Sequence, residues 1–204
     1  MIIQSSAKAA DQRVLGLFGS ARKGGNSDIL LEEFLRGCED AGAEVERIHL
    51  NKLQVSGCLA CGGCEKDGHC VVKDEMSQVY ASLERCNLVV IASPIYFYSV
   101  PAQAKAVIDR SQALWSRKYV LKKGKKSVPE GGAPRKGFFI AVGATRGKKI
   151  FEGVCLTVKY FFDAIDVPYT GELLYRGVDA KGDIRKHPEA LQECYDAGTR
   201  FVSA

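Results

Sequence analysis

Residues 88–99, LVVIASPIYFYS, begin with the clearest core strand of the chain and end in an aromatic turn. The five apolar residues 88–92 are typical of a strand that is buried on both faces of a parallel sheet. Tyr96, Phe97 and Tyr98 follow almost directly. A structural turn at the carboxyl edge of a sheet seldom needs three rings, whereas a flat heteroaromatic ligand stacks on them. The alternative is that these rings form an oligomer interface.

Strand-like and helix-like segments alternate on both sides of this run. Short apolar or alternating segments predict five strands, at 13–18, 43–50, 88–92, 137–142 and 169–174. Amphipathic segments predict helices at 27–41, 74–86, 100–116 and 148–165, with a last helix beginning at Pro188. The alternation predicts one flavodoxin-like α/β domain over residues 1–204, a doubly wound parallel sheet of order 2-1-3-4-5. In this order ligands bind at the carboxyl ends of strands 1 and 3.

The loop after the first predicted strand, GSARKGGNS at residues 19–27, has the composition of an anion site. It offers hydroxyls, a guanidinium, glycines that expose backbone N–H groups, and the start of a helix. It has neither the G-x-G-x-x-G spacing of a dinucleotide fold nor the ending of a P-loop, which disfavours ATP and a tightly held NAD. The alternative is an ordinary strand-to-helix turn. The loop at 143–147, GATRG, is a weaker signal for the approach of a ligand to the backbone.

Four cysteines lie close together as Cys58-x-x-Cys61-x-x-Cys64-x5-Cys70, in a loop predicted at residues 51–73. This spacing favours an iron–sulfur cluster in which each iron takes one thiolate. Structural zinc, a redox-active thiol pair and plain reduced thiols are the alternatives. We expect His69 to be a surface residue rather than a ligand. The scattered cysteines are expected to be buried reduced thiols; they are Cys38, Cys86, Cys155 and Cys194.

The composition of the 204 residues is that of a globular protein with a mild net charge of +5. Much of that charge lies in a basic loop predicted at 117–136, so the balance does not indicate nucleic-acid binding. This loop would either steer an acidic ferredoxin or the phosphates of NAD(P)H, or be an ordinary solvated loop. The sequence contains no secretory signal pattern and no apolar run long enough for a membrane span, so we expect no membrane association and a cytoplasmic location.

These motifs resemble the flavodoxin-like NADPH-dependent FMN reductases and, more closely, the iron–sulfur flavoproteins. The resemblance covers most of the first 165 residues and depends mainly on SPIYFYSVPAQAKAVIDR and the cysteine spacing. It implies FMN, with the phosphate at Ser20, Arg22, Asn26 and Ser27, and with the ring near Pro94, Ile95, Tyr96, Phe97, Gly143, Ala144 and Thr145. It also implies a [4Fe-4S] cluster on Cys58, Cys61, Cys64 and Cys70, in a homo-oligomer, a dimer or tetramer, with FMN near the subunit interface.

The predicted function is that of an FMN-dependent oxidoreductase, an electron-transfer flavoprotein that couples FMN to a [4Fe-4S] cluster. Its electrons would come from ferredoxin or NAD(P)H. Because the cofactors supply the chemistry, we expect no essential general acid or base. The alternatives are an NAD(P)H-dependent FMN or quinone reductase without a functional cluster, and a flavin-based redox sensor.

Overall fold

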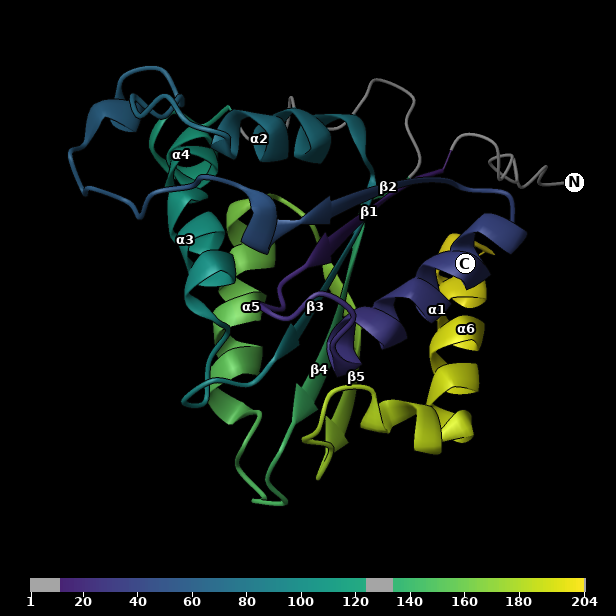
Figure 1. The fold of residues 1–204 in the computed structure, drawn as a ribbon. Coiled ribbons are helices and arrows are strands. Elements are labelled where there is room, and N and C mark those ends of the chain that lie inside the picture. The colour runs from purple at the N-terminus through teal and green to yellow at the C-terminus, as the bar shows by residue number, and fades with distance from the viewer. Residues whose placement is uncertain (1–11, 124–133, 204) are drawn as a thin grey trace, which may run out of the picture.

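The fold is built on a five-stranded, all-parallel sheet of order β2-β1-β3-β4-β5 (Figure 1). A computed structural model describes residues 12–123 and 134–203. The predicted order is confirmed, and β1 lies beside β3 at the point where the winding reverses. The carboxyl ends of these two strands therefore point to one edge of the sheet. The strands are β1 (Arg13–Phe18), β2 (Glu44–His49), β3 (Leu88–Pro94), β4 (Lys136–Gly143) and β5 (Tyr169–Arg176).

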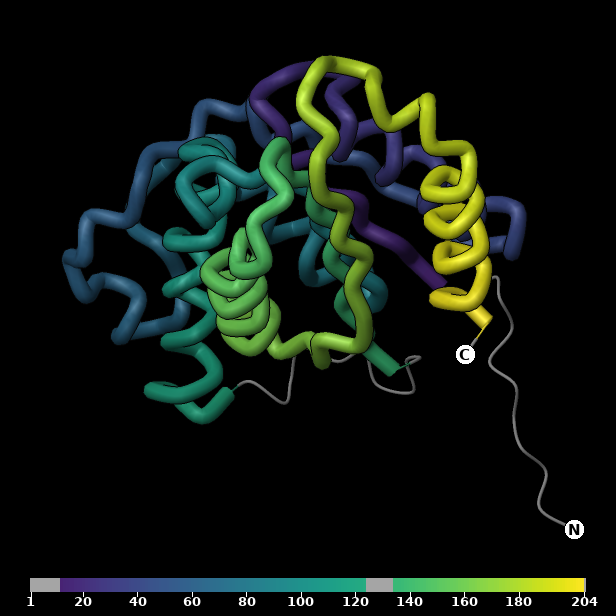
Figure 2. Tube along the Cα trace, turned by 90° about the horizontal axis from the view of Figure 1, so that it is seen from below, coloured from purple at the N-terminus to yellow at the C-terminus, as the bar shows by residue number. Residues whose placement is uncertain are grey.

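Helices cover both faces of the sheet, as Figure 2 shows from below. On one face lie α1 (Asn26–Asp40) and α6 (Pro188–Ser203). On the other lie α2 (Met76–Arg85), α3 (Ala102–Arg110) and α5 (Glu152–Ala164), and the short α4 (Gln112–Trp115) follows α3. Short 3-10 turns lie at η2 (Leu50–Lys52), η3 (Gly63–Glu65) and η6 (Asp183–Lys186). Within the described ranges, no helix is long and apolar enough to span a bilayer.

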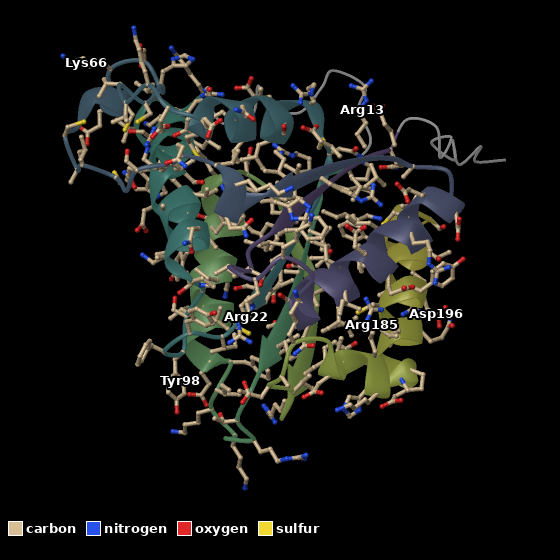
Figure 3. All side chains as sticks on the ribbon, viewed as in Figure 1. Arg13, Arg22, Lys66, Tyr98, Arg185 and Asp196 are labelled. Atoms are coloured by element: carbon tan, nitrogen blue, oxygen red, sulfur yellow. The ribbon has the colours of Figure 1, made fainter. Side chains whose placement is uncertain are left out.

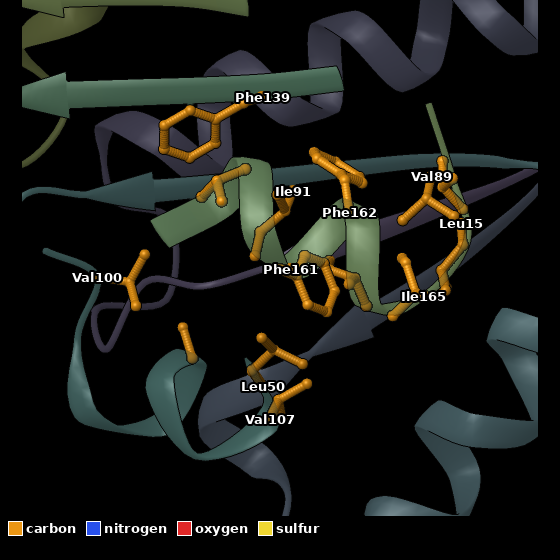
Figure 4. Close-up of a cluster of buried hydrophobic side chains, with 14 of the residues drawn as sticks. Leu15, Leu50, Val89, Ile91, Val100, Val107, Phe139, Phe161, Phe162 and Ile165 are labelled. Atoms are coloured by element: carbon orange, nitrogen blue, oxygen red, sulfur yellow. The ribbon is translucent and has the colours of Figure 1, made fainter. Parts of the chain in front are cut away.

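The central strand β3 is buried on both faces because alternate side chains enter two separate cores. Val89 and Ile91 belong to the core shared with α5, where they lie near Phe162 (Figure 4). Leu88 and Val90 belong to the core shared with α1 and α6. A continuous apolar run is what this double burial requires. The two helical layers thereby hold the carboxyl end of β3 in a fixed position.

Two glycines allow α1 and α6 to pack backbone against backbone. A Cβ on Gly198 would lie 1.9 Å from the Phe34 carbonyl oxygen, and one on Gly37 would lie 2.1 Å from the Tyr195 carbonyl oxygen. Neither oxygen belongs to a flexible side chain, so only glycine fits at either position. This contact fixes the end of α6 against α1, whose first turn borders the carboxyl edge of the sheet.

The helix predicted at 100–116 differs from the structure at both ends and in the middle. It breaks at Ser111, and a π-helical segment, η4 (Ser116–Val120), extends it into the region predicted as a loop. The Trp115 and Tyr119 rings pack at 5.4 Å between centroids, and the Tyr119 hydroxyl donates to Asp163 Oδ2 at 2.8 Å. The contact with Asp163 of α5 spans 44 residues of sequence, so local sequence patterns do not show it.

The described residues of the basic stretch predicted at 117–136 make more contacts than a solvated loop would. Arg117 pairs with Glu84 at 2.9 Å, Lys118 pairs with Asp163 at 3.0 Å, and Arg135 is buried. Only part of this stretch is therefore an exposed charge run; Lys122 and Lys123 are exposed. Residues 124–133 of this stretch, which include Lys125, Lys126 and Glu130, lie outside the described residues.

The four scattered cysteines follow the expectation with one exception. Cys38, Cys86 and Cys194 are buried free thiols, while Cys155 is only partly buried. Burial raises the pKa of the Cys38 thiol to about 12, so this thiol stays protonated and unreactive. These three residues act as small apolar side chains of the core.

Candidate functional site

A cavity lies at the carboxyl edge of the sheet, between the loops that follow β1, β3, β4 and β5. The structure brings to it most of the residues predicted to hold FMN, and Arg22 is labelled there in Figure 3. Phe97, Gly143 and Thr145 are not among its lining residues, although Gly143 ends β4 at the same edge. The lining residues are Ser20, Arg22, Gly25, Asn26, Ser27, Pro94, Ile95, Tyr96, Val142, Ala144, Val178, Asp179 and Lys181.

The loop after β1 is held in an open turn by its own polar groups. Ser20 Oγ donates to the Arg22 carbonyl oxygen and accepts from the Arg22 N–H, both at 3.0 Å. Gly24 has φ +66°, a left-handed conformation that glycine adopts without strain. Gly25 immediately precedes α1 without a side-chain cap, so the N–H groups of the first helical turn need another partner. The start of α1 therefore directs the positive end of a helix dipole, and N–H groups that have no acceptor within the helix, toward the cavity.

Asn26 connects this loop to the segment after β5. Its Nδ2 donates to the Ala180 carbonyl oxygen at 2.9 Å, and its Oδ1 accepts from the Ile184 N–H at 3.2 Å. The amide side chain is thus used within the protein. The same connection brings Asp179 and Lys181 to the cavity.

Ser27 has a polar side chain without a partner. It is 1% exposed, it lines the cavity, and its Oγ has no hydrogen-bond partner among the described residues. An unpaired buried hydroxyl costs stability, so its position at a helix start indicates a ligand oxygen. Sequence reasoning missed Val178, Asp179 and Lys181, since no local motif marks the loop after β5.

The first residues of the aromatic turn after β3 line the cavity, and the next two lie on the surface. Pro94, Ile95 and Tyr96 line the cavity, and the Ile95 N–H donates to the Val142 carbonyl oxygen at 3.0 Å. Phe97 is 101% exposed, and both Phe97 and Tyr98 have positive φ angles, at 49° and 62°. Such angles are uncommon for aromatic residues. The turn therefore holds two large rings outside the core at a conformational cost.

A second cavity, of about 470 Å³, contains all four clustered cysteines. The loop between β2 and α2 supplies Cys58, Cys61, Cys64 and Cys70, and the α3–α4 junction supplies Arg110. Gly62 has φ +69°, and it begins the turn that separates Cys61 from Cys64. The four cysteines of the predicted cluster thus line one space, although they are spread over 13 residues of loop.

No three His, Cys, Asp or Glu side chains in the described ranges converge on a single metal-ion position. A [4Fe-4S] cluster makes a different demand, because each iron takes one thiolate and the four sulfurs stand around the cluster. The side chain of His69 is 71% exposed and lies 3.5 Å from Asp67, so it is a surface residue in this structure. The Gly68 N–H donates to the Cys64 carbonyl oxygen at 2.8 Å and is not free for a sulfur.

A buried ion pair anchors the cysteine loop to α3. Arg110 Nη1 lies 2.7 Å from Asp74 Oδ2, and Asp74 also accepts from the Ser56 N–H at 3.1 Å. Burial acts to raise the pKa of Asp74, but hydrogen bonds from Arg110, Ser56 and Met76 lower it to about 2. Asp74 is therefore a carboxylate at neutral pH. Both ends of the cysteine loop, at Ser56 and Asp74, are thus tied to one arginine.

The two cavities share no lining residue and lie in different parts of the molecule. In Figure 3, Lys66 of the cysteine loop lies at the far end of the view from Arg22 and Tyr98. Groups bound in the two cavities of one chain would therefore not be in contact.

A doubly wound sheet with an anion-type pocket at its switch point defines a flavodoxin-like protein of the nucleotide-binding type. The family model of the NADPH-dependent FMN reductases matches residues 12–150. The chain belongs to this family, which confirms the family expected from the sequence. The matched region contains the first four strands and the whole cysteine loop.

Two similar proteins carry names that fit the cysteine pattern. An iron–sulfur flavoprotein of Archaeoglobus fulgidus is 38% identical over 98 residues, 48% of this chain and 44% of that protein. An iron–sulfur flavoprotein of Methanosarcina thermophila is 30% identical over 125 residues, 61% of this chain and 65% of that protein. The chain thus spans about half to two thirds of the length of these relatives.

The solved structure of an NAD(P)H:quinone oxidoreductase from Methanothermobacter marburgensis has the same fold. The TM-score is 0.71 with 17% identity, over 94% of this chain and 96% of that chain. At this identity the likeness supports the fold alone.

Proposed function

We propose that the protein is an electron-transfer flavoprotein that holds FMN at the carboxyl edge of the sheet and a [4Fe-4S] cluster in the cysteine cavity. The observation that carries this proposal is that four cysteines line one cavity in a chain of the FMN reductase family. Structural zinc on the same cysteines would be the alternative occupant of this cavity.

The carboxyl-edge cavity fits the phosphate of FMN. The unpaired Ser27 Oγ, the Arg22 guanidinium and the N–H groups of the first turn of α1 are donors for phosphate oxygens. Lys181 adds a second cation, while Asp179 adds one anion. The flavin ring would lie against the backbone of the turn at Pro94, Ile95 and Tyr96, near Ala144.

The cysteine cavity fits a cluster rather than a redox disulfide. Its volume of about 470 Å³ is far larger than the space between two thiols in a disulfide, and all eight cysteines are free. Each of Cys58, Cys61, Cys64 and Cys70 would supply one thiolate. A cluster passes electrons singly and FMN accepts either a hydride or two single electrons, so their combination converts between electron counts.

The electrons would move between cofactors of neighbouring subunits, since the two cavities of one chain are separate. A homo-oligomer is supported by exposed apolar side chains that border the carboxyl-edge cavity or lie on α5 behind it. Gly153 of α5 lies against the Tyr98 backbone, so α5 and the aromatic turn beside the cavity are neighbours. The exposed side chains are those of Tyr96, Phe97, Tyr98, Leu156 and Tyr160. Ferredoxin or NAD(P)H in the cytoplasm would be the electron donor.

The test is the iron, sulfide, zinc and FMN content of anaerobically purified protein. We expect about four irons and four sulfides per FMN. Cys64→Ala should lose most of the iron while retaining FMN, and Cys155→Ala, which changes a cysteine outside the cavity, should retain both. Zinc, or FMN without iron, in the wild-type protein would refute the cluster. That result would favour the second candidate, an NAD(P)H-dependent FMN or quinone reductase, which the family assignment alone supports.

A further inference from the structure

Arg110 is a fully buried cation at the wall of the cysteine cavity. It is 1% exposed and ends α3, and it lines the cavity together with Cys70. Burial of a guanidinium destabilises the folded protein unless the group is paired with a carboxylate and its other N–H groups are hydrogen-bonded. A residue of this kind therefore has a defined set of partners.

Two of its three nitrogens are saturated by the protein. Nη1 donates to the Ser56 carbonyl oxygen at 3.1 Å and to Asp74 Oδ2 at 2.7 Å. Nη2 donates to the Val72 carbonyl oxygen and to Asp74 Oδ1, both at 3.2 Å. Because Nη1 and Nη2 each donate to one oxygen of the Asp74 carboxylate, these bonds fix the plane of the guanidinium.

The third nitrogen, Nε, is buried and has no hydrogen-bond partner among the described residues. Burial opposes the charge of Arg110, but Asp74 and the nearby Cys70 together raise its pKa. Cys70 and Arg110 line the same cavity, so a cysteine side chain lies beside a guanidinium whose only donor without a partner among the described residues is Nε–H. The orientation is fixed by Asp74, so the donor cannot turn away to water.

We infer that Arg110 Nε–H donates a hydrogen bond to the Cys70 sulfur when that sulfur binds the cluster, and that Arg110 and Asp74 together set the cluster's reduction potential. The inference rests on the proposed function. A cationic donor at a cluster ligand stabilises the state that carries one more electron, so it makes the potential less negative. Asp74 partly offsets this effect because its carboxylate lies on the far side of the guanidinium.

The inference predicts shifts of opposite sign at the two residues. Arg110→Lys keeps the positive charge and a donor for Asp74 but lacks Nε–H, so the midpoint potential should become more negative. Asp74→Asn keeps hydrogen-bonding atoms but removes the negative charge, so the potential should become less negative. Arg47→Lys is the matched control, because Arg47 also pairs with carboxylates, Glu32 and Glu39, but lies outside the cavity. Its potential should equal that of the wild type.

The measurement is an anaerobic redox titration followed by the EPR signal of the reduced cluster, with iron and sulfide determined on each sample. Unchanged potentials in both variants that retain a full cluster would overturn the inference. Wild-type protein without iron and sulfide would overturn the proposed function as well, so the two failures are distinguishable.

A second measurement needs no change in the ion pair. Wild-type protein labelled with ¹⁵N-arginine should show a ¹⁵N coupling to the reduced cluster in pulsed EPR. Arg117, which lies near the loop with Nη2 at 3.4 Å from the Gly68 carbonyl oxygen, is the other candidate source. The coupling should persist in Arg117→Lys. Its absence from the labelled wild type, or its loss in Arg117→Lys, would show that Arg110 does not contact the cluster ligand.

Discussion

The Gly24 N–H donates to Asp28 Oδ2 at 2.9 Å, so a carboxyl group in the first turn of α1 holds the loop proposed to bind phosphate. Asp28 is 4% exposed, and its Oδ1 has no partner within the described part of the chain. Burial raises the pKa of Asp28 to about 6, against the smaller opposing effect of the Gly24 and Gly25 N–H groups. The loop is therefore held by a group that titrates near neutral pH.

Asp28→Asn should change how stability depends on pH. A raised carboxyl pKa means that the folded protein binds the proton more tightly than the unfolded chain does. The resulting stabilisation is present below the unfolded pKa and is lost as the pH rises through about 6. An asparagine side chain can still accept the hydrogen bond from the Gly24 N–H, and it places no negative charge in the buried site. The variant should thus be more stable than the wild type by up to about 3 kcal/mol at about pH 8, and by much less at about pH 4.

Urea unfolding of FMN-free protein at the two pH values checks this, because bound ligand would add its own pH dependence. An equal difference at both pH values would mean that Asp28 does not titrate as described.

Ser27→Ala should weaken the binding of FMN but not of riboflavin. The hydroxyl is assigned to a phosphate oxygen, and loss of one hydrogen bond to a charged group costs about 1.5–3 kcal/mol. The FMN dissociation constant should rise roughly tenfold or more. Flavin fluorescence titrations with both ligands measure this, and Ser203→Ala on the exposed end of α6 is the control. Equal losses for FMN and riboflavin would place Ser27 away from the phosphate.

Gly198→Ala should destabilise the fold through the α1–α6 contact. The new methyl group would meet the Phe34 carbonyl oxygen, which moves only if the two helices separate. Overpacking of this kind costs about 3 kcal/mol or more. Thermal unfolding should show a lowered midpoint, whereas Gly57→Ala, where a Cβ meets nothing within 4 Å, should leave the midpoint unchanged. A wild-type midpoint for Gly198→Ala would show that the helices are not in backbone contact.

Charge reversal of Lys122 and Lys123 to Glu should slow reduction by an acidic ferredoxin. Both side chains are exposed, and steering by such charges weakens as salt screens them. The rate loss should be large at low ionic strength and small at high ionic strength in stopped-flow measurements. Reversal of Arg185 and Arg200, two exposed cations near and on α6, changes the net charge equally and should have little effect. Equal rates at low salt for the wild type and the lysine variant would rule out steering by these residues.

The sequence predicted the strand order because each strand has a local signature, such as the apolar run of β3. Helix ends that depend on distant partners were less predictable. The extension of the α3–α4 helix through η4 depends on contacts with Asp163, which lies 44 residues beyond Tyr119. The start of α5 at Glu152 was predicted too early because 148–151 form a turn in which Ile150 and Phe151 are buried.

The residues of the candidate sites also differ in whether a local sequence pattern marks them. Ser20, Arg22 and Ser27 could be named from sequence because they lie in one loop with a phosphate-binding composition. Lys181 could not, because only the bonds of Asn26 to Ala180 and Ile184 bring its segment to the cavity. The buried pair of Arg110 and Asp74 was also missed, since a charged residue at the end of a helix normally faces solvent.

Because the two cavities share no lining residue, each can change during evolution without a direct effect on the other. Substitutions around the four cysteines, at residues 58–72, can accumulate without changing a residue that lines the carboxyl-edge cavity. A lineage can therefore vary the cysteine cavity while selection maintains the cavity at the carboxyl edge of the sheet. The same independence gives protein engineers two separately adjustable sites on one small scaffold.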